Sequence, residues 1–153
     1  MIRHPAVAGQ FYPGTPKALT DQIAGFIREP KQKEKVVGAV SPHAGYIYSG
    51  KVAGQLYSRI EIPQTAVIIG PNHRGVGADY AIMTDGEWAT PLGNVQIDTV
   101  LAGAILKHCR YVKEDREAHR YEHSLEVQVP FLQYLRKDIR IVPLCIGAYD
   151  EAA

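Results

Sequence analysis

Two histidines of this chain each follow an apolar, β-branched run that is typical of a buried strand. His43 comes after residues 36–40 and His73 after residues 66–70, with a proline between run and histidine in both places. A continuously apolar run predicts a strand buried on both faces of a parallel sheet. Sites of open α/β sheets lie beyond the carboxyl ends of the strands, so both imidazoles are expected at one edge. Because imidazole commonly binds zinc, iron and copper, the first hypothesis is a metal site containing His43 and His73.

A third histidine, His123, lies among carboxylates in residues 122–126. A helix start explains the carboxylates, because the positive end of the helix dipole favours negative charge, but a cap needs no imidazole. His123 is therefore a candidate third ligand or a catalytic acid/base beside a metal-bound substrate, and we assign it proton transfer. The remaining histidines are interpreted as structural or solvated; they are His4, His108 and His119.

Length and composition favour one globular domain over residues 1–153. The net charge of +1 gives no electrostatic footprint for nucleic acid or anionic lipid. The sequence contains no run as long as a membrane span and no signal-peptide pattern at its start, so we expect a cytoplasmic protein. Cys109 and Cys145 are expected as reduced thiols, with Cys145 in the core. The absence of a Gly-rich phosphate loop and of a nucleophile elbow disfavours nucleotide-binding and acyl-transfer enzymes.

Strand-like and helix-like segments alternate along the chain, which predicts an α/β fold with a mostly parallel sheet and helices on both faces. Residues 87–93, which include Trp88, are expected as a loop, and Pro130 is expected to kink a helix. The expected helices contain residues 16–27, 52–60, 99–108 and 125–135, and the expected strands contain residues 36–40, 66–70, 80–84, 95–97 and 139–146.

Five stretches occur in one order along nearly the whole chain: residues 3–13, 42–46, 70–73, 90–93 and 122–126. Together they resemble the Memo family (mediator of ErbB-driven cell motility), in particular its prokaryotic branch, the AmmeMemoRadiSam system protein B. The resemblance implies a fold similar to class III extradiol dioxygenases, the non-haem iron enzymes that open catechol rings. It also implies a cleft in which His43 and His73 match metal-binding histidines, with iron or copper as the metal.

The chain departs from the family pattern after the expected strand 139–146. Family members continue with an Asp-x-x-His cluster and a later cysteine ligand, and neither has a counterpart here. Residues 1–153 are therefore expected to form the N-terminal part of a longer family domain. The sheet is then incomplete at its C-terminus, and metal is bound weakly.

Three functions remain open at this point. The first is a metal-binding Memo-like protein with an accessory or redox role, and the name of the branch implies Ammecr-type and radical-SAM proteins as partners. The second is an extradiol ring-cleaving dioxygenase. The third is a non-enzymatic module that binds a peptide or protein in the same cleft. The aromatic residues expected near the site suit a small aromatic ligand or a peptide side chain; they are Tyr12, Tyr46, Tyr48 and Trp88.

Overall fold

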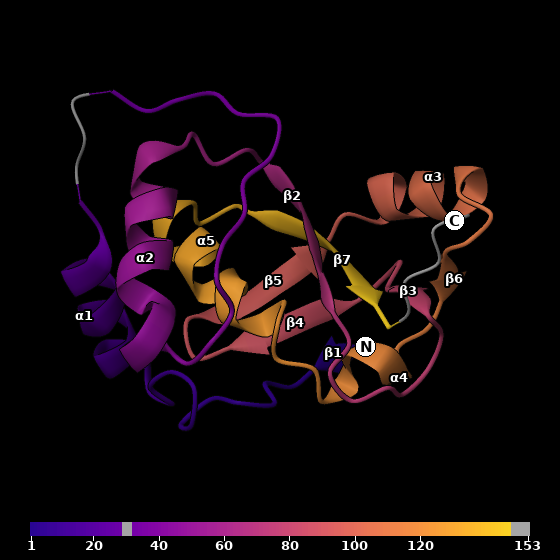
Figure 1. Cartoon of the computed structure of the whole chain (residues 1–153), viewed down its shortest axis with the longest axis horizontal. Helices are drawn as coiled ribbons and strands as arrows, with labels where there is room; N and C mark the ends of the chain where they lie inside the picture. Colours follow the sequence, from indigo (N-terminus) through magenta and orange to yellow (C-terminus); the bar gives the residue numbers. More distant parts are fainter. Residues whose placement is uncertain (29–31, 148–153) are drawn as a thin grey trace.

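Within residues 1–28 and 32–147, which the computed structural model describes, seven strands form one mixed sheet with helices around it (Figure 1). The strand order is β1-β4-β5-β7-β3-β6, and β2 pairs with β7 off this path. The strands are β1 (Ile2–Arg3), β2 (Thr65–Pro71), β3 (Tyr80–Ile82), β4 (Glu87–Thr90), β5 (Gly93–Ile97), β6 (Lys113–Glu114) and β7 (Arg140–Ile146).

Strand β7 is the centre of the sheet. It pairs in parallel with β2 over seven residues, from Thr65 opposite Arg140 to Pro71 opposite Ile146. Because β2 fills one edge of β7, the other edge is shared by β5, which is parallel, and β3, which is antiparallel. The α/β class is confirmed, and the described sheet is mixed, with four parallel and two antiparallel pairings.

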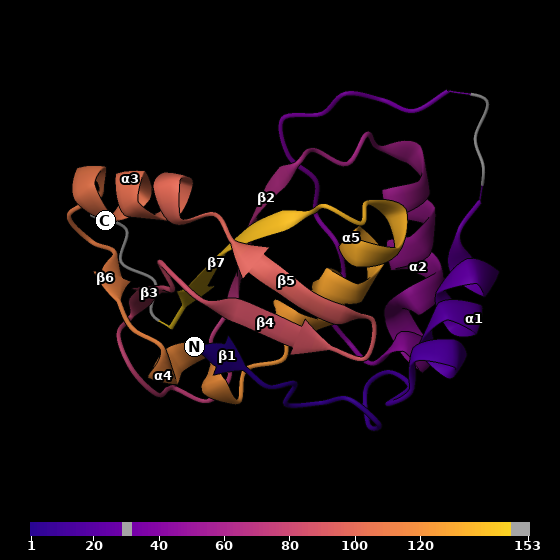
Figure 2. The ribbon, with the colours of Figure 1, turned by 180° about the vertical axis from the view of Figure 1, so that it is seen from behind.

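The helices gather at two ends of the sheet. Helices α1, α2 and α5 pack against one another at one end, and α3 packs on β7 at the other (Figures 1 and 2). They are α1 (Pro16–Phe26), α2 (Tyr46–Arg59), α3 (Thr99–His108), α4 (Glu117–Arg120), the 3-10 helix η1 (Glu126–Gln128) and α5 (Val129–Leu135). No helix in the described part of the chain is long and apolar enough to cross a membrane.

A side-chain cap marks the start of α3, and a proline marks the start of α5. Asp98 caps α3, since its carboxylate accepts a hydrogen bond from the Leu101 backbone N–H at 3.0 Å. The predicted kink at Pro130 is wrong, because this proline lies in the first turn of α5, where a backbone N–H has no intrahelical partner.

The predicted strand over residues 36–40 is also wrong. These residues form no strand, and Val37 and Val40 are almost fully exposed, at 111% and 95%. A strand requires a partner edge, and none of the described strands pairs with this run. His43 therefore follows an irregular segment instead of the end of a sheet strand.

The predicted loop over residues 87–93 is in large part a β-hairpin. Strand β4 pairs with β5 in antiparallel register, and Gly93, with φ of +114°, provides the left-handed backbone conformation at the turn. Trp88 is buried, and its indole N–H donates to the Met83 sulfur at 3.3 Å. The hairpin escaped prediction because its pairing depends on the partner strand more than on its own short sequence.

The core contains the thiol predicted there. Cys145 on β7 is fully buried, and burial raises the pKa of its thiol to about 12, with the nearby Glu122 charge adding to the effect. The thiol therefore stays protonated at neutral pH in the metal-free chain.

His119 is fully buried on α4, with its ring edge-on to Trp88 at a centroid distance of 5.8 Å. Neither of its ring nitrogens has a hydrogen-bond partner among the described residues. Burial, together with the positive charge of Arg3, lowers the pKa of His119 from 6.5 to about 4. Of the two interpretations, structural or solvated, burial excludes the solvated one, and the imidazole is neutral at pH 7.

This buried imidazole predicts a pH-dependent stability. The pKa of His119 is about 4 in the folded chain and 6.5 as a model value, so between these pH values the unfolded chain binds more protons. The contribution is fully present above about pH 6.5 and is lost as the pH falls toward 4, by on the order of 3 kcal/mol. Urea unfolding at pH 7.5 and 4.5 should show a smaller difference in His119→Phe than in the wild type. The exposed His108→Phe should behave as the wild type; an unchanged difference in His119→Phe would contradict the assignment.

Candidate metal centre

Three histidines from three separate segments form one cluster. His43 precedes α2, His73 follows β2, and His123 lies between α4 and η1. The ring centroids are 5.2 Å apart for His43 and His73 and 6.1 Å apart for His43 and His123. The rings of His73 and His123 stack at 4.5 Å with an interplanar angle of 17°. The structure therefore brings together all three histidines that the sequence singled out.

A turn at the carboxyl end of β2 positions His73. The Asn72 side-chain oxygen accepts hydrogen bonds from the backbone N–H groups of Arg74 and Gly75 at 3.1 and 3.0 Å. The backbone N–H of Asn72 donates to the Ile146 carbonyl oxygen at 2.7 Å, which ties the turn to the end of β7. Asn72 is thus a turn residue at the end of β2.

A close contact brings the third segment to the same place. A Cβ at Gly70 would lie 2.9 Å from the Ser124 hydroxyl oxygen, so a larger residue at the end of β2 would push the Ser124 turn away. The Ser124 hydroxyl donates to the Pro71 carbonyl oxygen at 2.7 Å. Strand β2 and the segment before η1 are therefore held together beside His73.

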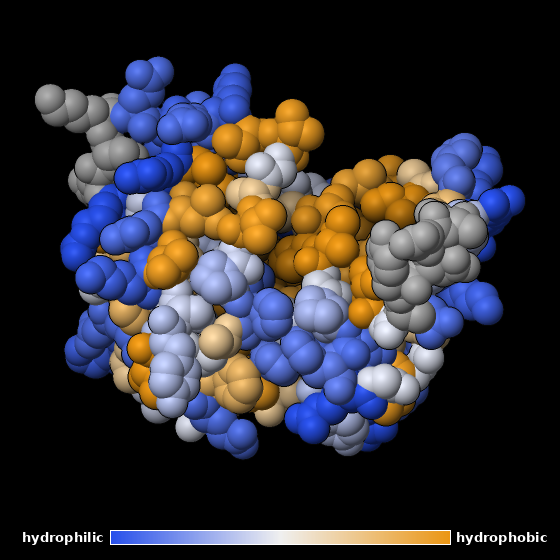
Figure 3. Space-filling model, viewed as in Figure 1, coloured by the Kyte–Doolittle hydropathy of each residue, from blue (hydrophilic) through white to orange (hydrophobic). Residues whose placement is uncertain are grey.

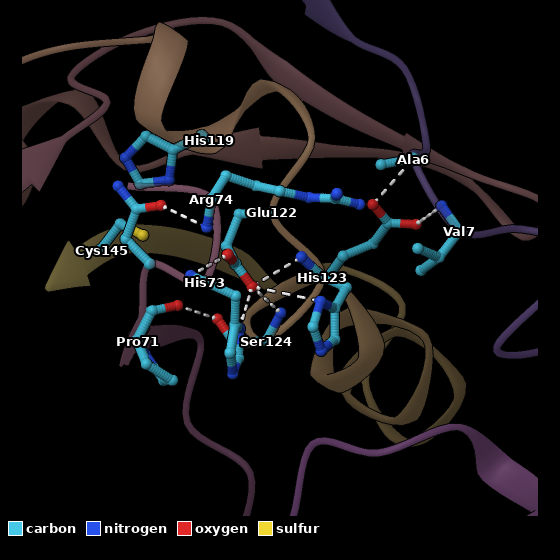
Figure 4. A network of polar contacts seen from close by, with 12 residues as sticks. Ala6, Val7, Pro71, His73, Arg74, His119, Glu122, His123, Ser124 and Cys145 are labelled. Atoms are coloured by element: carbon cyan, nitrogen blue, oxygen red, sulfur yellow. Dashed lines mark hydrogen bonds and ion pairs between the residues drawn. The ribbon is translucent and has the colours of Figure 1, made fainter. Parts of the chain in front are cut away.

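Glu122 joins the two segments through one buried carboxylate (Figure 4). Its Oε2 accepts from the backbone N–H of His73 at 2.6 Å, and its Oε1 lies 2.9 Å from Nδ1 of the same residue. Its Oε1 also accepts from the backbone N–H groups of His123 and Ser124, both at 2.8 Å. The sequence reasoning assigned this carboxylate only to a helix start, although its position next to His123 was a usable signal.

Burial and hydrogen bonds set the protonation of Glu122 and His123. Burial would raise the pKa of Glu122, but hydrogen bonds from the His73 ring and from backbone N–H groups outweigh it and lower the pKa to about 2. The carboxylate is therefore ionised at neutral pH. Burial also lowers the pKa of His123, more than the Glu122 charge raises it. His123 is thus neutral at pH 7, as metal binding or general-base catalysis requires.

The cluster has the donor set of a transition-metal site. One ligand atom each from His73, Glu122 and His123 lie within 4.8 Å of one another. Imidazole and carboxylate donors suit iron, copper and zinc. In this conformation both oxygens of Glu122 accept hydrogen bonds, and its Oε1 lies 2.9 Å from Nδ1 of His73 and 3.4 Å from Nδ1 of His123, so the carboxylate orients both imidazoles.

The aromatic surroundings differ from those expected. Tyr12, Tyr46 and Trp88 are buried in the core, whereas Tyr48 is exposed. The hydroxyl of Tyr46 donates to the Val127 carbonyl oxygen at 2.8 Å, so it is unavailable to a ligand. The aromatic ring that does contact the cluster was missed: Phe11, whose centroid lies 4.7 Å from that of His123.

A second buried carboxylate, that of Glu126, binds the N-terminal segment next to the cluster. Glu126 forms an ion pair with Arg3 and accepts from the Tyr12 hydroxyl at 2.6 Å. It also accepts from the backbone N–H groups of Ala6 and Val7 at 2.8 and 3.1 Å (Figure 4). These hydrogen bonds hold the N-terminal segment against the segment that contains Glu122 and His123.

Arg3 extends this support to the backbone before the site. Its Nη2 donates to the Glu122 carbonyl oxygen at 2.7 Å, and its Nε donates to the His119 carbonyl oxygen at 3.0 Å. Its guanidinium also lies over the Trp88 ring, 4.3 Å from the centroid. Arg3 and Glu126 together therefore fix the backbone that presents Glu122.

Comparison with known proteins decides the family. A family model described as "Memo-like protein" matches residues 3–153. The chain belongs to the Memo family. A MEMO1 family protein of Archaeoglobus fulgidus is 51% identical over 150 residues, which cover 98% of this chain and 56% of that protein. One of Aquifex aeolicus is 49% identical over 149 residues, which cover 95% of this chain and 55% of that protein.

A MEMO1 family protein of Pyrococcus abyssi is 46% identical over 161 residues, which cover 99% of this chain and 55% of that protein. This Memo family chain therefore spans little more than half the length of the curated relatives it matches. The stretches that carried the resemblance meet in space: residues 122–126 contact residues 3–13 through Glu126 and residues 70–73 through Glu122.

Proposed function

We propose that this Memo family chain binds a divalent transition metal, iron or copper, at the cluster of His43, His73 and His123. The observation that carries the proposal is the buried Glu122 carboxylate at 2.9 Å from Nδ1 of His73. A carboxylate in this position holds the proton on Nδ1 and leaves Nε2 free for a metal, as in many metal sites with a carboxylate behind the ligating histidine.

The residues take different roles in this proposal. His43 and His73 are the metal ligands, and His123 transfers a proton to or from a substrate bound beside them. The lowered pKa of His123 keeps its imidazole unprotonated at neutral pH, which supports the role of a base. A bound iron or copper ion would supply Lewis-acid or redox chemistry.

The proposal also includes a cellular role. The family resemblance favours an accessory or redox role in the AmmeMemoRadiSam system, with Ammecr-type and radical-SAM proteins as partners. A cytoplasmic location belongs to the same proposal and agrees with the free thiols of Cys109 and Cys145.

Two alternative functions receive less support. A dioxygenase of this kind uses two histidines and one carboxylate as ligands, whereas Glu122 here accepts hydrogen bonds from His73, His123 and Ser124. A peptide-binding cleft is less supported because Tyr12, Tyr46 and Trp88, three of the four aromatic residues expected to line it, are buried in the core.

Titration of the metal-free chain tests the proposal. We expect one equivalent of ferrous ion, added without oxygen, or of cupric ion to bind the wild type in calorimetry. His43→Ala should weaken binding at least tenfold with an unchanged circular dichroism spectrum, because His43 lies on a loop and its truncation removes little buried surface. The exposed His108→Ala is the matched control and should bind as the wild type does. A wild type that binds no metal would overturn the proposal, and unchanged affinity in His43→Ala would remove this residue from the ligand set.

A further inference from the structure

A pocket separate from the candidate metal centre lies between β1 and the segment that contains α4. It has a volume of about 430 Å³ and is lined by residues 1–6, by Met83 after β3, and by side chains from residues 116–121. None of the three clustered histidines lines it. Pockets that bind small molecules have volumes of roughly 300–1,000 Å³. Figure 3 shows largely hydrophilic surface around α4, whereas the large hydrophobic area of that view lies over β2.

One wall of this pocket is apolar. It is formed by Ile2, Pro5, Ala6 and Met83. Arg3 lies in the same wall, but each of its three guanidinium nitrogens already donates to an oxygen of the α4–η1 region. The wall therefore offers apolar contact and no free charge, which suits the apolar part of a ligand.

Two arginines stand at the other side of the pocket. Arg116 has helical dihedral angles just before α4, so Arg116 and Arg120, four positions apart, lie on one face of that turn. Nη2 of Arg116 donates to Asp85 at 2.7 Å, and Nη1 contacts only the Met1 sulfur, a weak acceptor, at 3.4 Å. Arg120 lies 3.4 Å from Glu117, and both side chains are about 60% exposed, so this pair contributes little stability. Both guanidinium groups therefore keep donors for an anion.

We propose that this pocket binds a small molecule with an apolar body and an oxyanion head group, a carboxylate or a phosphate. The body contacts Ile2, Pro5 and Met83, and the head group accepts hydrogen bonds from Arg116 and Arg120. Guanidinium binds oxyanions through paired, charge-assisted hydrogen bonds, which are about twice as strong as neutral ones. A neutral ligand would gain the apolar contact alone, and a cationic ligand would be repelled by the arginines.

Trp88 provides a signal for binding in this pocket. It is the one tryptophan of the chain and is buried. Its indole N–H donates to the sulfur of Met83 at 3.3 Å, and the guanidinium of Arg3 lies 4.3 Å from the ring centroid. Met83 and Arg3 both line the pocket, so a ligand that contacts them changes the surroundings of the indole ring and its fluorescence.

Titration of the metal-free full chain with octanoate, followed by Trp88 fluorescence and by calorimetry, tests the proposal. We expect one equivalent of octanoate to bind with a saturable change in emission, and octyl phosphate to bind in the same way. The tighter of the two identifies the head group. Shorter carboxylates should bind about fourfold more weakly for each methylene removed. Octan-1-ol, which lacks the charge, should bind about tenfold more weakly than octanoate.

Single variants locate the site. Arg120→Gln should bind octanoate about tenfold more weakly, whereas Arg59→Gln, at an exposed arginine of α2 outside the pocket, should bind as the wild type does. Ile2→Asp should also weaken binding, because it places a carboxylate in the apolar wall, and Val52→Asp on the exposed side of α2 is its matched control. His73→Ala should leave octanoate affinity unchanged, which separates this pocket from the candidate metal centre. Thermal unfolding of each variant checks that the fold is kept.

Several results would overturn the proposal. One is the absence of saturable binding of both octanoate and octyl phosphate. Equal affinities for octan-1-ol and octanoate, or an unchanged affinity in Arg120→Gln, would remove the arginines from the site. Binding that is seen by calorimetry without any change in Trp88 emission, or that His73→Ala abolishes, would place the ligand elsewhere on the chain.

Discussion

His73→Ala is expected to weaken transition-metal binding at least a hundredfold, which abolishes it at the concentrations used for titration. His73 is the histidine closest to both of the others, at centroid distances of 5.2 Å from His43 and 4.5 Å from His123. It is also the one whose Nδ1 is held by the Glu122 carboxylate. Removing the His73 side chain takes away a ligand that Glu122 already orients. The site then has one metal donor fewer and is less pre-organised for binding. Calorimetric titration with ferrous ion under nitrogen and with cupric ion measures the effect.

Two further variants, measured in the same titration, are compared with His73→Ala. Glu122→Gln should lower metal affinity about 10- to 100-fold, since it removes the carboxylate behind His73 and keeps the imidazole. His123→Ala should lower metal affinity less than His73→Ala does, because we assign His123 to proton transfer. Equal affinities of His73→Ala and the wild type would rule out His73 as a ligand. A larger loss in His123→Ala than in His73→Ala would exchange the two roles.

Glu126→Leu is expected to lower the free energy of unfolding by about 3–5 kcal/mol, which is the usual cost of removing one partner from a buried ion pair. Arg3 is then left buried without its carboxylate, and the Tyr12 hydroxyl and the backbone N–H groups of Ala6 and Val7 lose their acceptor. Urea unfolding at pH 7 measures the loss. Metal affinity should fall as well, because Arg3 also holds the backbone of Glu122.

The control for this variant is an ion pair at the surface. Lys17 and Asp21 on α1 are 2.6 Å apart and mostly exposed, so Asp21→Asn should leave the free energy of unfolding unchanged within error. The double variant Arg3→Met with Glu126→Leu should recover part of the stability, since no buried charge is then left unpaired. A loss in Glu126→Leu no larger than that in Asp21→Asn would show that the buried pair does not stabilise the fold.

Local sequence patterns were sufficient for several elements. Local signals predicted helices over residues 16–27 and 99–108, which became α1 and α3, and a strand over residues 139–146, which became β7. Each of these signals lies within about one turn or one strand length, where steric and capping preferences act directly. The same local logic found His73, because a strand followed by proline fixes where the next residues must lie.

Long-range partners decided the rest of the fold. Residues 36–40 have the composition of a strand but no partner edge, and their exposure shows that β propensity acts only with a neighbour. Residues 87–90 became β4 because β5 and β1 pair with them. His43 lies in the histidine cluster although residues 36–40, the strand expected before it, form no strand. The mixed sheet likewise follows from which strands meet at the two edges of β7.

The sequence by itself determined an α/β chain of the Memo family and the three histidines of its candidate site. Only the tertiary structure decided what the two buried carboxylates do. Glu122 meets His73 across 49 positions, and Glu126 meets Arg3 across 123 positions. A buried charge is stable only where hydrogen-bond donors converge on it, and such donors come from segments distant in sequence. No local pattern could show that convergence, so the orientation of His73 had to be read from the folded chain.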